Sequence, residues 1–439
     1  MSEKIATILG IFEDHHATYF KNSMHAPYAT VEEGNIKRTF PLIDSEEADD
    51  FIRRAHYEEF KQIPTASNIK EALYTLRALI PHEGGTKDAE FRTAGNASVI
   101  EYDYGAQDRK VALITANGWE NGSPNIPFIR VQSMQEQVQP LSIADDEKIA
   151  VLNEFKALLG LNDDQFVIIM TYLLSCFCPS GPYPILVIQG QEGSSKSTLS
   201  NFIRLLVDPN LALASSLPTK EKDIMISMMH NQLLVFDNLS GLNDKISDWL
   251  CRASTGTGLT VRKLRTDSTP IVFTGSCPIL LNGIDNIAQR SDLISRSLII
   301  NLTALKDGQR LTKSEVNEKF NALRPKLLGI LFDALSVILK DLPETSVTTN
   351  HRMIDAIKWA TPAEQLLGFA IGAVQGVCER NYLDTIATSL NDDLVCSILL
   401  EHINNLGRQK WSGTMTKLLN TLTSRAVMVK YFCRVSKPH

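Results

Sequence analysis

A run of nine residues has the types and spacing that hold a triphosphate. It consists of Gly190, Gln191, Glu192, Gly193, Ser194, Ser195, Lys196, Ser197 and Thr198. An apolar stretch at 185–189 precedes it and a helix-like stretch at 199–207 follows, which is the strand–loop–helix context of a phosphate-binding loop. In such a loop the backbone N–H groups face the anion, and the N-terminus of the next helix favours negative charge.

Two side chains of this loop have predicted roles with ATP and Mg²⁺. Lys196 is expected to reach the phosphates, and the Ser197 hydroxyl is expected to bind Mg²⁺. The usual pattern has Gly directly before the Lys, whereas this chain has Ser195. A serine can serve there only if its backbone angles are ones that a non-glycine residue tolerates. The competing interpretation is a Gly/Ser-rich turn with a surface lysine.

A second apolar stretch, 233–236, ends in the carboxylate of Asp237. In a phosphate-loop fold this strand is expected beside the one at 185–189, so that Asp237 holds Mg²⁺ opposite Ser197. Asn238 follows, where hydrolytic ATPases of this kind usually carry Glu. An amide can orient a water but takes no proton from it. Glu192 is a candidate base, and the base stays unassigned.

A third apolar stretch ends in Asn282, and two arginines follow it. Asn282 is predicted to contact the γ-phosphate or the attacking water, with a strand cap or the start of the Gly283 turn as the alternative. Arg296 precedes the next strand, and we expect it to act as an arginine finger towards a neighbouring subunit. Arg290 is the alternate, and a solvated helix end is the competing interpretation for both.

A basic hairpin is predicted between the strands that end in Asp237 and Asn282. Its strands are expected at 260–264 and 270–273, around a polar turn. The basic residues near that turn are Arg262, Lys263 and Arg265. Such a hairpin could bind the phosphate backbone of DNA and move with the nucleotide state. A charged hairpin that is only solvated is the alternative.

The elements that must position these residues alternate between strands and helices. Strands are expected at 185–189, 233–236, 279–281 and 298–302. This alternation predicts an α/β fold with a mainly parallel, three-layered sheet. Helices are expected upstream at 48–60, 68–80, 145–159 and 163–177, and downstream at 313–339. A hairpin is expected from strands 98–102 and 110–114.

The Pro-rich breaker at 178–184 separates the sheet from what precedes it. We therefore expect four regions: an accessory or collar domain at 1–180, mostly helical α+β, an ATPase core at 181–305, a helical lid at 306–345 and a helical C-terminal region at 346–439. The final segment begins a helix near 418–422 and leaves open a truncated winged helix or a frameshifted end. Upstream, Glu101 and Asp103 are interpreted as part of a hairpin and not as a primase centre.

Composition bounds the class of protein. The 439 residues are too many for a single core. A net charge of −6 excludes a basic coat protein, but a local basic cluster can still bind nucleic acid. We see no signal peptide, and the apolar stretch 166–178 is too short to span a bilayer. The seven cysteines have no CxxC spacing, which favours reduced thiols in a cytoplasmic protein without a membrane partner.

The order of the motifs resembles the superfamily 3 helicase branch of the AAA+ ATPases, and most of all the helicase half of phage and mobile-element primase-helicases. The likeness covers residues 181–340. It implies a P-loop AAA+-type core and an ATP- and Mg²⁺-dependent homo-oligomeric ring, usually a hexamer, with basic hairpins in a central pore. By this resemblance Lys263 or Arg265 tracks single-stranded or forked DNA, and Arg296 completes the neighbour's site.

Three functions are compatible with the sequence. The first is an ATP-dependent DNA helicase or translocase in the replication of a phage or mobile element. The second is a nucleotide-gated assembly ATPase with little hydrolysis, as Asn238 suggests; phage defence or regulation fits either. The third is a P-loop kinase, for which no acceptor pocket is recognisable and which leaves the basic hairpin without a role.

Overall fold

The computed structural model describes residues 3–23, 25–80, 87–256, 259–262, 270–273, 275–284, 287–303, 311–392, 394–406 and 410–423. The chain divides into two compact units, Met1–Cys378 and Glu379–His439. In its described residues the first unit holds two antiparallel sheets, one parallel sheet and a two-stranded hairpin.

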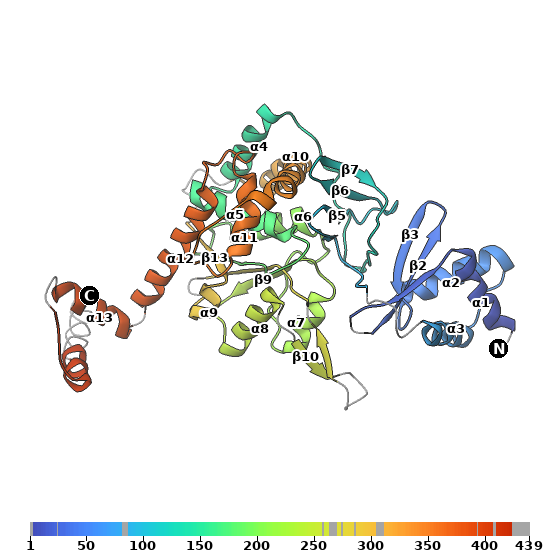
Figure 1. The fold of residues 1–439 in the computed structure, drawn as a ribbon, viewed down its shortest axis with the longest axis horizontal. Helices are drawn as coiled ribbons and strands as arrows, with labels where there is room; N and C mark the ends of the chain where they lie inside the picture. Colours follow the sequence, from blue (N-terminus) through green and yellow to red (C-terminus); the bar gives the residue numbers. More distant parts are fainter. Residues whose placement is uncertain are drawn as a thin grey trace. The chain divides into compact units, whose positions relative to one another are not determined.

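A small α/β region begins the first unit, and this region is coloured blue in Figure 1. It consists of α1 (Glu3–Asp14), β1 (Thr18–Lys21), β2 (Pro27–Glu33), β3 (Ile36–Pro41), α2 (Glu46–Phe60) and α3 (Ala66–Leu79), with the three strands antiparallel. Phe12, Phe40 and Phe51 pack together in its core. The Ser45 and Thr65 side chains cap α2 and α3. The helices expected at 48–60 and 68–80 are confirmed.

A second antiparallel sheet packs on the long helix α10 (Lys313–Asp341). Its strands lie in the order β4 (Thr93–Gly95), β5 (Val99–Asp103), β6 (Val111–Thr115) and β7 (Gly118–Gly122), and β5–β6 is the expected hairpin. The rings of Tyr102 and Trp119 contact Phe332 of α10. Helices α4 (Asp145–Leu158) and α5 (Asp163–Cys176), also expected, contribute to the same hydrophobic core.

The two acidic residues of β5 are structural. Glu101 accepts hydrogen bonds from the backbone and side chain of Asn125 and from the Ile126 N–H. Asp103 pairs with Arg130, with 2.6 Å between Oδ1 and Nη2. Both carboxylates are buried and have partners, which agrees with their interpretation as part of a hairpin.

Four parallel strands form the central sheet, in the order β13-β8-β12-β9. They are β8 (Ile185–Gly190), β9 (Leu234–Leu239), β12 (Ile279–Gly283) and β13 (Ser297–Leu302). The α/β class, the parallel sheet and all four strands agree with the sequence. One prediction was wrong: the strand of Asp237 does not lie beside β8, because β12 lies between them. A crossover can place a returning strand on either side of its predecessor, so chain order does not reveal sheet order.

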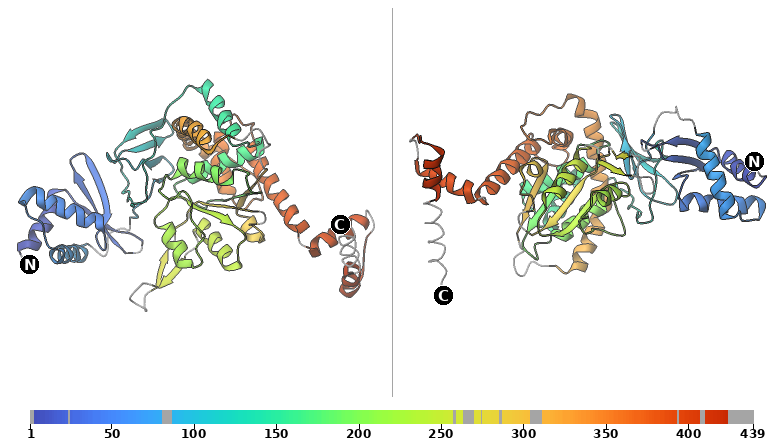
Figure 2. Two further views of the ribbon diagram at one scale, coloured as in Figure 1. Left: turned by 180° about the vertical axis from the view of Figure 1, so that it is seen from behind. Right: turned by 90° about the horizontal axis from the view of Figure 1, so that it is seen from below.

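Helices cover both faces of the central sheet, as Figure 1 shows from the front and Figure 2 from behind. Helices α5 and α6 (Lys196–Val207) lie on one face, and α7 (Glu221–Met228), α8 (Asp244–Thr255) and α9 (Ser291–Ile294) lie on the other. The hairpin of β10 (Leu259–Arg262) and β11 (Pro270–Phe273) extends from the latter side. This is the expected three-layer arrangement.

Most of the described residues after the start of α10 are helical. After α10 come the 3-10 turn η1 (Leu342–Glu344), α11 (Ile354–Ala360), the turn η2 (Thr361–Ala363), α12 (Ala373–Asp392) and α13 (Leu394–Leu406). Residues 415–423 are helical, as expected for 418–422. The winged-helix prediction extends over 424–439, which lie outside the described residues. Among the described residues no two cysteines form a disulfide, in agreement with the expected thiols.

No single helix of the described ranges is long and apolar enough to cross a membrane. Helices α4 and α5 pass the same length and composition test only when taken as a pair, and they are bent by 108° relative to each other.

Candidate active site

The loop at 190–198 leaves the carboxyl end of β8 and leads directly into α6. Gly190 has φ 150° and Gly193 has φ 79°, in the region that favours glycine. A Cβ on Gly190 would lie 2.3 Å from the Leu302 carbonyl oxygen, so a larger residue does not fit. Ser195 has φ 63° and ψ 20°, so it adopts left-handed angles at a cost of roughly 1–2 kcal/mol. The serine therefore keeps the backbone shape of the glycine that the usual pattern has here.

Lys196 curls back over the loop. Its Nζ donates to the carbonyl oxygens of Gly190 and Gln191, each at 2.8 Å. The side chain of Ser195, the N-cap residue, does not cap α6, so the first N–H groups of the helix can receive an anion. Glu192 is exposed on the loop. The ammonium group and the helix N-terminus together favour a negatively charged ligand.

Asn282 is completely buried at the end of β12 and contacts α6. Its Nδ2 donates to Ser200 Oγ at 3.2 Å and to Ser197 Oγ at 3.4 Å. Its Oδ1 is also buried, and no described residue donates a hydrogen bond to it. A buried acceptor without a donor costs about 1–3 kcal/mol, so this oxygen is suited to accept from a water or a ligand.

A β-bulge in β9 lies opposite Asn282. The register between β12 and β9 shifts between Leu281 and Gly283, so that Asp237 and Asn238 together oppose Asn282 alone. Asn238 has φ 59°, a conformation that Asn adopts more readily than most residues. Its N–H donates to Asp237 Oδ1 at 2.7 Å. The bulge thus changes the direction of these two polar residues, which lie at the carboxyl edge of the sheet.

The carboxyl edge brings together Lys196, Ser197, Asp237 and Asn282, all of which the sequence had singled out. Mg²⁺ prefers oxygen ligands and is usually held by one or two protein groups together with substrate phosphates. The hydroxyl of Ser197, an exposed residue, and the carboxylate of Asp237, a half-buried one, fit that requirement. Across the described ranges there is no cluster of three His, Cys, Asp or Glu that could hold a metal by itself. The donor set therefore suits an ion that arrives with a phosphate ligand.

A cavity of about 610 Å³ lies beside the loop, and the sequence did not indicate it. Gly193, Ser195 and Thr198 line one side. The end of α4 with the turn after it, at 154–160, and the segment 311–323, which includes the start of α10, supply the other walls. Its lining combines apolar residues such as Leu158 and Val316 with the charged residues Glu154, Lys313 and Lys319. Its walls come from three distant segments, so no local pattern could have predicted it.

The two arginines lie on either side of the short helix α9. Arg296 Nη1 donates to the Asp292 carbonyl oxygen at 2.8 Å, and the side chain is only 11% exposed. Arg290 is 38% exposed and pairs with Asp248 at 2.9 Å and with Asp244 at 3.4 Å. Arg290 is thus the more accessible of the two in the single chain. Neither contacts the loop of its own chain in any described interaction.

The basic hairpin is formed by β10 and β11, whose register pairs Arg262 with Pro270. The expected strand pair is present, with its first strand ending at Arg262. Lys263 and Arg265 lie outside the described residues, so their roles remain predictions from the sequence.

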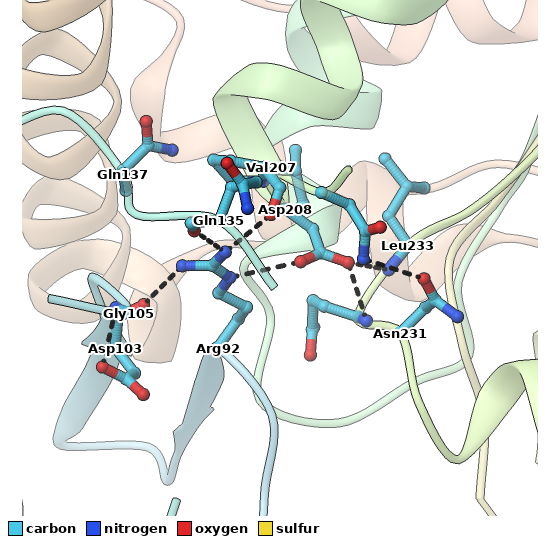
Figure 3. A network of polar contacts seen from close by, with 12 residues as sticks. Arg92, Asp103, Gly105, Gln135, Gln137, Val207, Asp208, Asn231 and Leu233 are labelled. Atoms are coloured by element: carbon cyan, nitrogen blue, oxygen red, sulfur yellow. Dashed lines mark hydrogen bonds and ion pairs between the residues drawn. The ribbon is translucent and has the colours of Figure 1, made fainter. Parts of the chain in front are cut away.

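A buried polar network holds the far end of α6 (Figure 3). Asp208, the C-cap residue of α6, accepts a hydrogen bond from Arg92 Nε at 3.2 Å and pairs with Arg204 Nη1 at 3.4 Å. Arg92 also donates to the backbone oxygens of Asp103, Gln135 and Pro209. The second sheet is thereby joined to the helix that follows the loop.

The same network reaches the start of β9. Arg204 donates to the Leu233 carbonyl oxygen, and burial lowers the pKa of its guanidinium while Asp208 opposes that shift. The Tyr102 hydroxyl donates to the Val207 carbonyl oxygen at 3.0 Å, and burial raises the pKa of Tyr102 to about 12. No sequence pattern indicated this network, because many of its partners lie far apart in the chain: Arg204 and Leu233 are 29 positions apart, and Arg92 and Asp208 are 116 apart.

Comparisons with known proteins found a matching family model and similar solved structures. A family model described as "Actinomycete integrative conjugative element replication protein" matches residues 157–389. The apo C-terminal region of NrS-1 has a TM-score of 0.45 and 11% sequence identity, over 96% of this chain and 87% of that one. The SCCmec type IV Cch structure, titled an active helicase, has a TM-score of 0.43 and 14% identity, over 90% and 78%. No curated protein matches the sequence. The family match confirms the expected likeness to replication proteins of mobile elements.

Proposed function

Because the chain belongs to the replication protein family of actinomycete integrative conjugative elements, we propose that it is an ATP-dependent DNA helicase or translocase. Its central sheet and covering helices would form a P-loop core of AAA+ type, with the start of α10 as part of the lid. The substrate would be single-stranded or forked DNA of the mobile element.

One observation supports the ATPase most directly. With β12 between β8 and β9, the Asn282 amide reaches Ser197 while the Asp237–Asn238 bulge faces it from the other strand. A Gly/Ser-rich turn with a surface lysine would need neither the buried amide nor the bulge. A single phosphate ligand that contacts the ends of β8, β9 and β12 would explain why these groups lie at the same edge of the sheet.

The residues have separate roles in this proposal. The backbone N–H groups at 190–198 and Lys196 bind the phosphates, and the cavity beside Gly193 takes the base and ribose. Ser197 and Asp237 hold Mg²⁺, which when bound neutralises charge on the phosphates. The free Asn282 oxygen orients the attacking water. Asn238 cannot remove a proton from that water, and the exposed Glu192 is the candidate that could.

A ring would complete the site from a neighbouring subunit. Arg296 or Arg290 would stabilise the transition state in trans, and the hairpin with Arg262, Lys263 and Arg265 would bind DNA in a central pore. Mixing the Lys196→Ala variant with Arg296→Ala tests the finger, because a mixed ring contains some sites with both groups intact. Recovered turnover is expected for the residue that acts in trans. Arg290→Ala in the same mixture is the matched comparison, and no recovery with either variant rejects both arginines.

The test of the function is ATP turnover by the purified protein with and without single-stranded DNA. Turnover should rise with DNA and vanish in Lys196→Ala. The double variant Lys263→Ala/Arg265→Ala should keep basal turnover and lose the stimulation, whereas Lys245→Ala/Lys340→Ala, which removes two exposed charges elsewhere, should behave like the wild type. If DNA still stimulates the ATP turnover of the hairpin variant fully, the hairpin does not bind DNA.

Asn238 favours a second candidate, a nucleotide-gated assembly ATPase. This amide takes the position at which a general base is usual, and it lies exposed at the bulge. The second candidate predicts oligomers that depend on ATP, with negligible turnover even when DNA is present. Unwinding of a forked substrate would dismiss it.

A further inference from the structure

A second, smaller cavity of about 130 Å³ lies between the first antiparallel sheet and the β5–β6 region. A row of threonines crosses the sheet side: Thr18 pairs with Thr30, and Thr30 pairs with Thr39. All three line the cavity, and the hydroxyls of Thr30 and Thr39 are 2.8 Å apart. Lys37 lies two residues before Thr39 on the same face of β3 and lines the cavity as well. This wall is therefore rich in hydrogen-bond donors.

The charged residues of the lining are mostly cations. Lys37, Lys87, Arg109 and Arg130 line the cavity together with one carboxylate, that of Asp103. The Asp103 carboxylate is already occupied, because it accepts hydrogen bonds from Arg130 and from the Gly105 N–H at 2.9 Å. The lining is consequently positive in a protein whose net charge is −6.

Two cations of the cavity, Arg109 and Arg130, repel each other. Arg109 is paired with Glu47 at 2.7 Å, yet burial lowers its pKa, and the nearby guanidinium of Arg130 adds to that effect. Lys37 has only an exposed partner, Glu32 at 3.7 Å, which contributes little. Lys87 is exposed and makes no ion pair with any described residue. An anion in the cavity would relieve this repulsion.

We propose that this cleft binds a backbone phosphate of a DNA strand, an assignment that rests on the proposed action on DNA. The cavity has room for a phosphate group but is about a fifth as large as the one beside the 190–198 loop. The rest of the ligand therefore lies outside it, where Lys37 and Lys87 meet the neighbouring phosphates. The Thr18 hydroxyl donates to the phosphate held inside, as does whichever of the Thr30 and Thr39 hydroxyls does not donate to the other. Contacts of this kind are independent of base sequence. The cleft is separate from the hairpin of β10 and β11, so the chain has a second site that contacts the DNA strand.

The test uses the full chain and a fluorescein-labelled oligothymidylate, with the dissociation constant measured over a series of salt concentrations. The variant is Lys37→Gln/Lys87→Gln, and the matched control is Lys4→Gln/Lys70→Gln, which removes two exposed charges from α1 and α3. The cleft variant should bind several-fold more weakly at low salt. Its slope of log affinity against log salt should be shallower by about 0.7 for each phosphate that the variant no longer neutralises. ATP turnover without DNA should be unchanged in both variants.

The outcomes separate this assignment from the proposed function. If the wild type and both variants bind the oligonucleotide with equal affinity and slope, the cleft is not a DNA site, although the chain acts on DNA. If the wild type binds no oligonucleotide, both the proposed action on DNA and the assignment of the cleft are wrong. Competition with inorganic phosphate and with thymidine monophosphate provides the third arm. If the cleft variant loses binding of these small anions but keeps its DNA affinity, the cleft serves a free phosphate compound and the assignment is overturned.

Discussion

Arg92 and Asp208 form a buried ion pair between residues 116 positions apart, with 3.2 Å between Nε and Oδ1. Both side chains are at most 3% exposed. Arg92 comes just before the second antiparallel sheet, and Asp208 ends the helix that begins at Lys196. The pair therefore links the upstream sheet to the element that carries the candidate phosphate loop. It also fixes one end of α6 in a location where water does not compete.

Breaking this pair should destabilise the protein strongly. Asp208→Asn leaves Arg92 buried without a counter-charge, and removal of one partner from a buried pair typically costs about 3–5 kcal/mol. The shift of the urea unfolding transition measures it. The control is Asp49→Asn, which breaks a half-exposed pair with Arg53 and should cost at most about 1 kcal/mol. If both variants shift the urea unfolding transition equally, the burial of the Arg92–Asp208 pair does not increase its contribution to stability.

Ser195→Gly should preserve nucleotide binding. Glycine reaches φ 63° without the strain of a side chain, and the gain of roughly 1–2 kcal/mol is partly offset by the greater freedom of the unfolded chain. We expect an unchanged or tighter dissociation constant for ATP, measured by calorimetry. Ser195→Val should bind about tenfold more weakly, a difference of about 1.4 kcal/mol, since a β-branched residue resists left-handed angles. Weaker binding by the glycine variant would mean that the hydroxyl itself contacts the ligand.

Asn282→Ala should separate binding from turnover. The amide contacts Ser197 and Ser200, and its free oxygen is predicted to orient water, so its loss should lower kcat by about 10²-fold. The dissociation constant for ATP should change little, because Lys196 and the loop remain. Asn301→Ala, on the exposed side of β13, is the control. A loss of ATP affinity that matches the loss of kcat would assign Asn282 a binding role instead.

The first turn of α10 should influence the affinity for ATP. Thr312 and Glu315 form a capping box, and Lys313 and Val316 beside them line the 610 Å³ cavity. Thr312→Ala removes the cap, which typically costs about 1 kcal/mol of helix stability, and should weaken ATP binding through fraying. Ser314→Ala keeps the cap and should have no effect. Equal affinities for all three proteins would show that nucleotide does not use this wall.

Low pH should act on the same turn. Hydrogen bonds from the backbone and hydroxyl of Thr312 lower the pKa of Glu315. A carboxylate with a lowered pKa in the folded state stabilises that state above its unfolded pKa of about 4.3, and this contribution is lost as pH falls through the folded pKa. ATP affinity should thus lose the contribution of the cap below about pH 4, and not between pH 5 and 7. The pH dependence of the dissociation constant in wild type and Thr312→Ala measures it, and the difference between the two proteins should shrink only in the acidic range.

Local sequence patterns predicted most of the elements. Helices with apolar periodicity, such as 163–177, and short apolar strands, such as 279–281, were correct because burial selects side chains at fixed spacing. The candidate loop at 190–198 was recognisable because its order of Gly, Lys and Ser is typical of phosphate-binding loops. The polar residues Asp237 and Asn282 could be picked out because each follows an apolar run.

The sequence by itself determined the α/β class, the strands and the residues that end them, since these depend on neighbours along the chain. Only the tertiary structure decided that β12 lies between β8 and β9, that Asp237 and Asn238 form a bulge opposite Asn282, and that a cavity opens beside Gly193. It alone also joined Arg92 to Asp208. The physical reason is that strand order, bulges and buried pairs depend on contacts between distant segments, and such contacts leave no periodic pattern along the chain.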